Sequence, residues 1–157
     1  METVPKELAE LDECASLYLR EISEPKQNSL RLLIEEAEVM PEEVAIRFVG
    51  REMGTGHLVR STANSRLFEI VWDNYVAYSV TNESYTTRNE SEEYSGRLAR
   101  LYRKSHFLDY IALATLACQE YPGPLHHFQL VCECHMIDAV STRSPRIEQM
   151  RPRPIPQ

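Results

Sequence analysis

The stretch from Leu67 to Tyr85 constrains the fold most, because it is the clearest β signal in the sequence. Its nineteen residues, LFEIVWDNYVAYSVTNESY, are rich in β-branched and aromatic side chains, which pack well on a pleated, half-buried surface. Strands usually run for about 3–10 residues, so we expect an interruption at Asp73-Asn74. No glycine stands there to supply the positive φ of a tight hairpin turn, which favours a bulged or bent long strand.

The rest of the chain adds shorter strands and two helices. Apolar residues recur at three- and four-residue steps over 5–22, which predicts an amphipathic N-terminal helix. A second helix is expected at about 106–120, after the potential N-cap Ser105, and it is apolar nearly all round. We therefore expect it to be buried against one face of the sheet. Further strands are predicted in the first half of 29–39 and at 57–61, 96–104 and 126–141, whereas the pattern over 34–40 fits a helix equally well.

Because strands are grouped together with few helices between them, the sequence predicts an α+β fold. We expect a mostly antiparallel sheet of four to five strands, with the N-terminal helix and the buried helix at about 106–120. Residues 1–147 are predicted to form a single domain, and 148–157 a Pro/Arg-rich C-terminal tail. Residues 40–66, with Pro41 and three glycines, are the least regular part of the domain.

Composition and the N-terminus favour a cytoplasmic protein. Hydrophobic residues make up 43% and charged residues 26%, which is typical of a globular chain of 157 residues. The N-terminus is acidic, unlike a secretory signal, and the longest apolar stretch, 110–118, is too short to span a bilayer. Four cysteines are too few for a disulfide scaffold. We therefore expect reduced thiols and no membrane association.

Charge is unevenly distributed. Residues 1–54 contain 13 acidic and 6 basic residues, whereas the remainder contains 11 of each. An acidic third argues against nucleic-acid binding, which requires a basic face. It is either a solvated surface or a surface complementary to a basic protein partner. In the second interpretation the candidate binding residues are Glu35, Glu38, Glu42 and Glu43.

The sequence contains no recognisable catalytic or cofactor motif. Cys132 and Cys134 share a face of a strand while His135 points to the other, so these metal-ligand types do not converge. We expect no catalytic residue, no cofactor and no metal site. Four carboxylates lie among apolar neighbours: Glu69, Asp73, Glu83 and Glu133. We expect them either to mark the solvent face of a half-exposed sheet or to pair with arginines, for which Arg97, Arg100 and Arg103 are the natural partners.

Three segments between Phe68 and Ile147 resemble a group of small, mostly uncharacterised bacterial single-domain proteins. These are FEIVWDNYVAYSVTNESY (68–85), RKSHFLDY (103–110) and HHFQLVCECHMIDAVS (126–141), the last followed by Pro145-Arg146-Ile147. Proteins of this kind sometimes serve as immunity proteins, which bind and block a toxin. The resemblance carries no functional motif, so it implies no site residue.

Two hypotheses of different classes follow. The first is a non-enzymatic protein-binding domain, of the immunity or antitoxin type, in which a homo-oligomer is a further option. The alternative is a small enzyme or small-ligand-binding domain with a site around Glu83, Arg100 and Tyr102. A deep pocket that contains a carboxylate with a strongly perturbed pKa would favour the second hypothesis.

Overall fold

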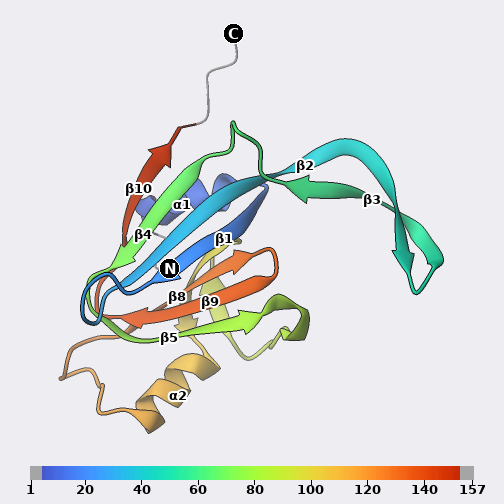
Figure 1. The fold of residues 1–157 in the computed structure, drawn as a ribbon. Helices are drawn as coiled ribbons and strands as arrows, with labels where there is room; N and C mark the ends of the chain where they lie inside the picture. The colour runs from blue at the N-terminus through green and yellow to red at the C-terminus, as the bar shows by residue number, and fades with distance from the viewer. Residues whose placement is uncertain (1–4, 153–157) are drawn as a thin grey trace.

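A computed structural model describes residues 5–152, which form an α+β fold of two five-stranded, antiparallel sheets and two α-helices (Figure 1). The first sheet has the order β1-β2-β4-β10, and β3 pairs with the far part of β2. Its strands are β1 (Ser16–Ser23), β2 (Leu30–Phe48), β3 (Arg51–Arg60), β4 (Leu67–Trp72) and β10 (Arg146–Arg151).

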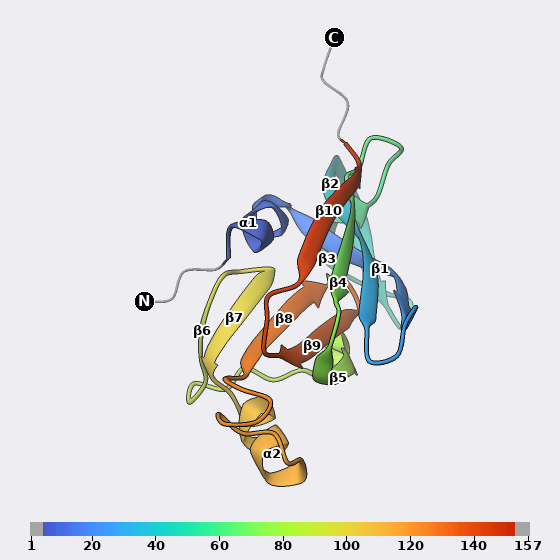
Figure 2. The ribbon, with the colours of Figure 1, turned by 90° about the vertical axis from the view of Figure 1, so that its left-hand side faces the viewer.

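The second sheet has the order β5-β9-β8-β7-β6. Its strands are β5 (Tyr75–Asn82), β6 (Glu93–Ser95), β7 (Ala99–Lys104), β8 (His126–Cys132) and β9 (His135–Ser141). The predicted α+β class and antiparallel pairing are thus confirmed, with the strands divided between two sheets (Figure 2).

The core lies between the two sheets, and alternation along the strands explains it. In β2, Leu30, Leu32 and Ile34 are fully buried, whereas the residues between them lie on the other face. Helix α1 (Lys6–Glu13) adds its buried Leu8 and Leu11 to the same core. The remaining members come mainly from the two sheets: Cys14, Leu17, Phe68, Ile70, Trp72, Leu98, Ala99, Leu101, Phe128, Leu130, Cys132, Ile137 and Ala139.

The predicted helix over 5–22 is wrong in its second half. Helix α1 ends at Glu13, and the chain then enters β1, whose pairing with β2 aligns Ser16 with Ala37 and Ser23 with Arg31. Leu17 reaches the core from this strand and is fully buried. The tertiary pairing with β2 therefore overrides a helical pattern that continues through the sequence.

The second helix begins at the predicted His106 but ends at Ala114, and it is not buried. Helix α2 (His106–Ala114) is N-capped by Ser105 as predicted, and it ends because Thr115 adopts an extended backbone conformation (φ −132°, ψ 171°). Within it only Ile111 is buried, whereas Leu113 is 89% exposed. The helix lies at one end of the second sheet instead of covering a sheet face (Figures 1 and 2).

Two predicted long strands are each divided. Asp73-Asn74 interrupts 67–85 as expected, and the chain bends there to pass from the first sheet to the second. Residues 126–141 are not one strand but a hairpin, β8–β9, which turns at Glu133-Cys134. Cys134 has a φ of 66°, so the turn is made without the glycine that would have marked it.

The predicted irregular tail also contains regular structure. Strand β10 pairs with β4 from Arg146 to Arg151, so the edge of the first sheet extends beyond the predicted domain limit at 147. The last five residues of the predicted tail lie outside the described residues.

Candidate functional site

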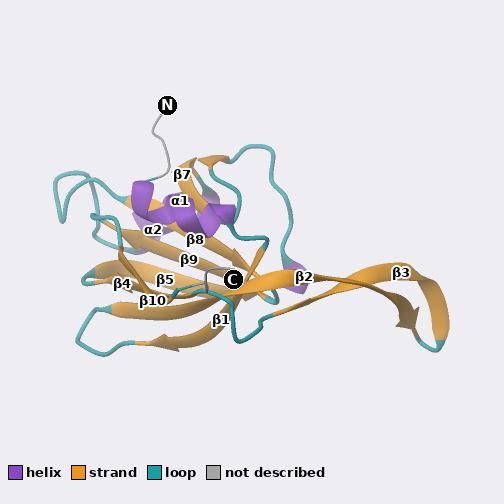
Figure 3. Cartoon of the chain, turned by 90° about the horizontal axis from the view of Figure 1, so that it is seen from above, coloured by secondary structure: helices purple, strands orange, loops and turns teal. Residues whose placement is uncertain are grey.

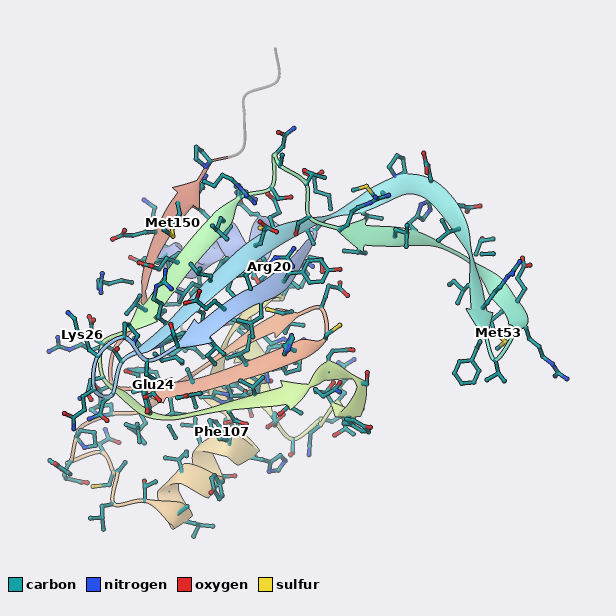
Figure 4. The ribbon with its side chains drawn as sticks, viewed as in Figure 1. Arg20, Glu24, Lys26, Met53, Phe107 and Met150 are labelled. Atoms are coloured by element: carbon teal, nitrogen blue, oxygen red, sulfur yellow. The ribbon has the colours of Figure 1, made fainter. Side chains whose placement is uncertain are left out.

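The most prominent surface feature is a two-stranded ribbon made by residues 38–60 of β2 and β3, which we call the arm. Strand β2 pairs with β1 and β4 only up to Ala37, and beyond that point β3 is its only partner. The arm leaves the sheet and projects far beyond the rest of the molecule (Figures 1 and 3). Met53 is 68% exposed and lies close to its end (Figure 4).

The root of the arm is firmly anchored, so the arm leaves the body in a defined direction. Tyr18 donates a hydrogen bond of 2.9 Å from its hydroxyl to the Val59 carbonyl. The buried Glu36 accepts hydrogen bonds from Arg66, and the Ser61 hydroxyl donates to the Glu36 carbonyl over 3.1 Å. These bonds tie both strands to the body where they leave it.

The arm has one apolar and one polar face. Val44, Ile46 and Phe48 alternate along β2 and therefore share a face. Opposite the first two stand Gly56 and Gly54, so no side chain from β3 covers them there. The Ile46 side chain lies directly over Gly56. A Cβ atom added to that glycine would be only 2.9 Å from Ile46 Cδ1, so a larger residue would not fit without a shift of Ile46.

The opposite face is polar. Glu43 pairs with His57, Ala45 with Thr55, and Arg47 with Glu52. Because these pairs alternate with the apolar ones, the ribbon is amphipathic although it has no core of its own. A face patterned in this way is normally covered by another layer.

The tip of the arm exposes large apolar side chains on a strained turn. Val49 and Gly50 connect the strands, and both have positive φ, 48° and 75°. A β-branched residue rarely adopts this conformation. Phe48 is 71% and Val49 86% exposed. Strain and exposed apolar area at one place indicate a contact surface.

The four acidic residues predicted from sequence do not form one cluster. Glu35 belongs to the body, where Arg20 and Arg151 both donate to it. Burial opposes its charge, but hydrogen bonds from Arg20, Ser61 and Arg151 outweigh this and hold its pKa below the usual value. Glu38 lies at the root of the arm, and Glu42 and Glu43 are exposed on it.

By contrast, the structure brings together the three residues of the alternative site. Glu83, Arg100 and Tyr102 all line an open cavity of about 1050 Å³ on the outer face of the second sheet. The loop 86–95 forms one wall, and Val131 and Met136 contribute apolar area. The predicted ion pairs of Arg97, Arg100 and Arg103 with Glu69, Asp73 or Glu83 do not form. Instead, the backbone N–H of Arg97 donates to Asp12, Arg100 donates to Gln129, and Arg103 pairs with Glu93.

A chain of polar side chains runs behind this cavity. Arg100 Nη1 and the Tyr102 hydroxyl each donate to Gln129 Oε1 over 3.0 Å. Gln129 Nε2 donates to Asp138 Oδ1 over 2.9 Å, and His127 Nε2 lies 2.7 Å from the same oxygen. Burial raises the pKa of Tyr102, which keeps its hydroxyl protonated as a donor.

The chain of bonds ends at Ser105, which gives a Ser-His-Asp sequence of contacts. Ser105 Oγ lies 2.8 Å from His127 Nδ1 and also accepts the Leu108 N–H. Ser105 is 1% and His127 2% exposed, and Phe107 packs against the His127 ring. A nucleophile must reach its substrate. This serine is closed off, so the arrangement orients side chains and caps α2.

The residues that the structure describes contain no group of three or more potential metal ligands, and no helix among them is long and apolar enough to cross a membrane.

Burial raises the pKa of Cys132 to about 12, so its thiol stays protonated at neutral pH. The β8–β9 hairpin turn separates Cys132 from Cys134, which is exposed.

Comparisons with known proteins identify no relative. No family model, curated protein or solved structure matches the chain.

Sequence reasoning missed the arm because its proline and glycines indicated irregular structure. The detectable signal was the alternation of Val44, Ile46 and Phe48 before Val49-Gly50. A two-residue connection that contains glycine is typical of a hairpin.

Proposed function

We propose that this protein is a non-enzymatic binding domain that recognises a basic protein partner through the arm, in the manner of an immunity or antitoxin component. The observation that carries the proposal is the exposed apolar surface of the arm and its tip, formed by Ile46, Phe48 and Val49 beside the half-buried Val44. An isolated two-stranded ribbon is at best marginally stable in water. A binding partner that covers it would supply the missing layer.

Charge supports a basic partner. The chain carries a formal net charge of −7, and all of the excess lies within residues 1–54. Glu42 and Glu43 stand exposed beside the apolar face, whereas Arg47 and Arg51 lie nearer the tip. A partner with an apolar patch and a basic rim would be attracted by the net negative charge of the molecule, and its rim would contact the acidic part of the arm.

The proposal is tested by capture with matched variants. Immobilised protein is exposed to a lysate of the source organism, and captured species are identified by mass. The partner is then purified and its affinity measured. Ile46→Ser combined with Phe48→Ser should weaken binding about a hundredfold, since apolar anchors at an interface each contribute about 1–2 kcal/mol.

Leu113→Ser is the matched control. Leu113 is even more exposed than Ile46 and Phe48, but it belongs to α2, away from the arm (Figure 1). We expect this variant to bind like the wild type. Loss of binding in Leu113→Ser, or full affinity in the arm variant, would contradict the proposal.

A further inference from the structure

We propose that the cavity on the outer face of the second sheet binds a small organic carboxylate, with Arg100 as the residue that receives the anionic group. This site is separate from the arm and does not depend on the function proposed for it. The Arg100 guanidinium is half-buried and has no carboxylate partner among residues 5–152. Partial withdrawal of a positive charge from water favours an anionic partner that offsets the lost hydration.

The guanidinium is held in one orientation. Its Nε donates to the Arg97 carbonyl over 3.1 Å, Nη1 donates to Gln129 over 3.0 Å, and its carbon lies 4.5 Å from the centre of the Tyr94 ring. Arginine has five N–H donors, so three remain after these bonds. Donors on both terminal nitrogens are available, which allows a carboxylate to be bound with two parallel hydrogen bonds.

The orientation of Arg100 is itself supported from behind. Gln129 is fixed by its bond to Asp138, which also meets His127, and His127 meets Ser105. The Tyr102 ring stacks on His127 at 4.4 Å and lies 5.0 Å from the Tyr94 ring. Gln129 and Tyr94, which contact the guanidinium, are therefore themselves held by packed and hydrogen-bonded neighbours, as in a preorganised binding site.

The lining decides which kind of anion fits. Val131 and Met136 supply apolar area near Arg100. The cavity is also lined by four glutamates against three arginines, so its field disfavours a dianion such as a phosphate. Glu93 pairs with Arg103, and Glu92 accepts the His106 N–H, whereas Glu83 and Glu90 form no ion pair with any residue in 5–152. A monoanionic carboxylate with an apolar body fits this lining, because its carboxylate can bind Arg100 while its apolar body contacts Val131 and Met136.

The test uses benzoate as the probe, with benzamide as its neutral counterpart of similar shape and inorganic phosphate as the dianion. Binding is followed by NMR through the Met136 methyl and the Arg100 Nε–H signals. We expect benzoate to shift both signals and benzamide and phosphate to bind at least about tenfold more weakly. Equal binding of benzamide, equal binding of phosphate, or no shift with benzoate would overturn the proposal.

Variants separate the role of Arg100 from a general field effect. Arg100→Gln and Arg100→Lys should each weaken benzoate binding about tenfold, because neither offers the planar fork. Arg103→Gln removes one positive charge from the same cavity, but Arg103 is paired with Glu93, so its effect should stay below about twofold. Backbone amide spectra establish that each variant is folded. Unchanged binding in Arg100→Gln, or an equal loss in Arg103→Gln, would overturn the assignment.

Discussion

Val49 and Gly50 form the turn of the arm with φ values of 48° and 75°, so a β-branched side chain occupies a left-handed position beside a glycine. Two-residue turns with positive φ at both positions prefer Asn-Gly. We expect Val49→Asn to stabilise the arm by about 1 kcal/mol, because asparagine tolerates this conformation better. Amide hydrogen exchange across the β2–β3 pairs should slow, while exchange in the core stays unchanged. Unaltered exchange in the arm would show that Val49 is not strained.

A second prediction concerns Ser105, which both caps α2 and meets His127. Ser105→Ala removes the cap and leaves His127 Nδ1 buried without its partner. We expect the free energy of unfolding to fall by about 1–3 kcal/mol, measured by urea denaturation. A reagent that labels active serines should leave the wild-type protein unmodified, because the hydroxyl is buried. Rapid labelling of Ser105 would instead reveal a catalytic site.

The Glu35 contacts predict a pH-dependent contribution to stability. The pKa of Glu35 is lowered in the folded protein, so its contribution is complete above the ordinary value of 4.5 and is lost as the pH falls through the lowered value. Glu35→Gln should cost about 1 kcal/mol at pH 7, since Arg20 and Arg151 are both partly exposed. In urea unfolding, the difference from wild type should shrink progressively below pH 4.5. A constant difference across this range would contradict the ion pairing.

The exposed acids of the arm should act on association rather than stability. Glu42→Lys combined with Glu43→Lys should leave unfolding unchanged but slow association with the basic partner. The wild-type association rate should fall steeply with added salt, which screens charge over about 8 Å at physiological ionic strength. Stopped-flow mixing measures both effects. An association rate indifferent to salt and to the reversals would make these glutamates a merely solvated surface.

Several features of the fold could be predicted because local pattern and tertiary structure agree. The β character of 67–85 and its break at Asp73-Asn74 follow from composition and strand length. The N-cap at Ser105 is likewise a local signal. The exposure of α2 could not be foreseen, because an apolar helix is ordinarily buried and nothing local encodes Thr115 ending it early.

The candidate sites were predictable to different degrees. Glu83, Arg100 and Tyr102 converge on a cavity because β7 and the loop after β5 lie at the same face of the second sheet, which sequence alone could only suggest. Gln129 and Asp138, which support Arg100 and Tyr102 from behind, gave no signal because they meet through the register of β8 and β9. Glu35 carried the same charge as Glu42 and Glu43, and only the structure separates a paired acid from exposed ones.

The most direct test of the arm's role is photo-crosslinking from its tip. p-Benzoylphenylalanine is placed at Phe48 or, as a control, at Leu113, which is 89% exposed on α2. After irradiation with the captured partner, products are separated by mass. We predict an adduct to the basic partner from position 48 and none from position 113. An adduct only between two copies of this chain, or partner adducts only from position 113, would contradict recognition of a basic partner through the arm.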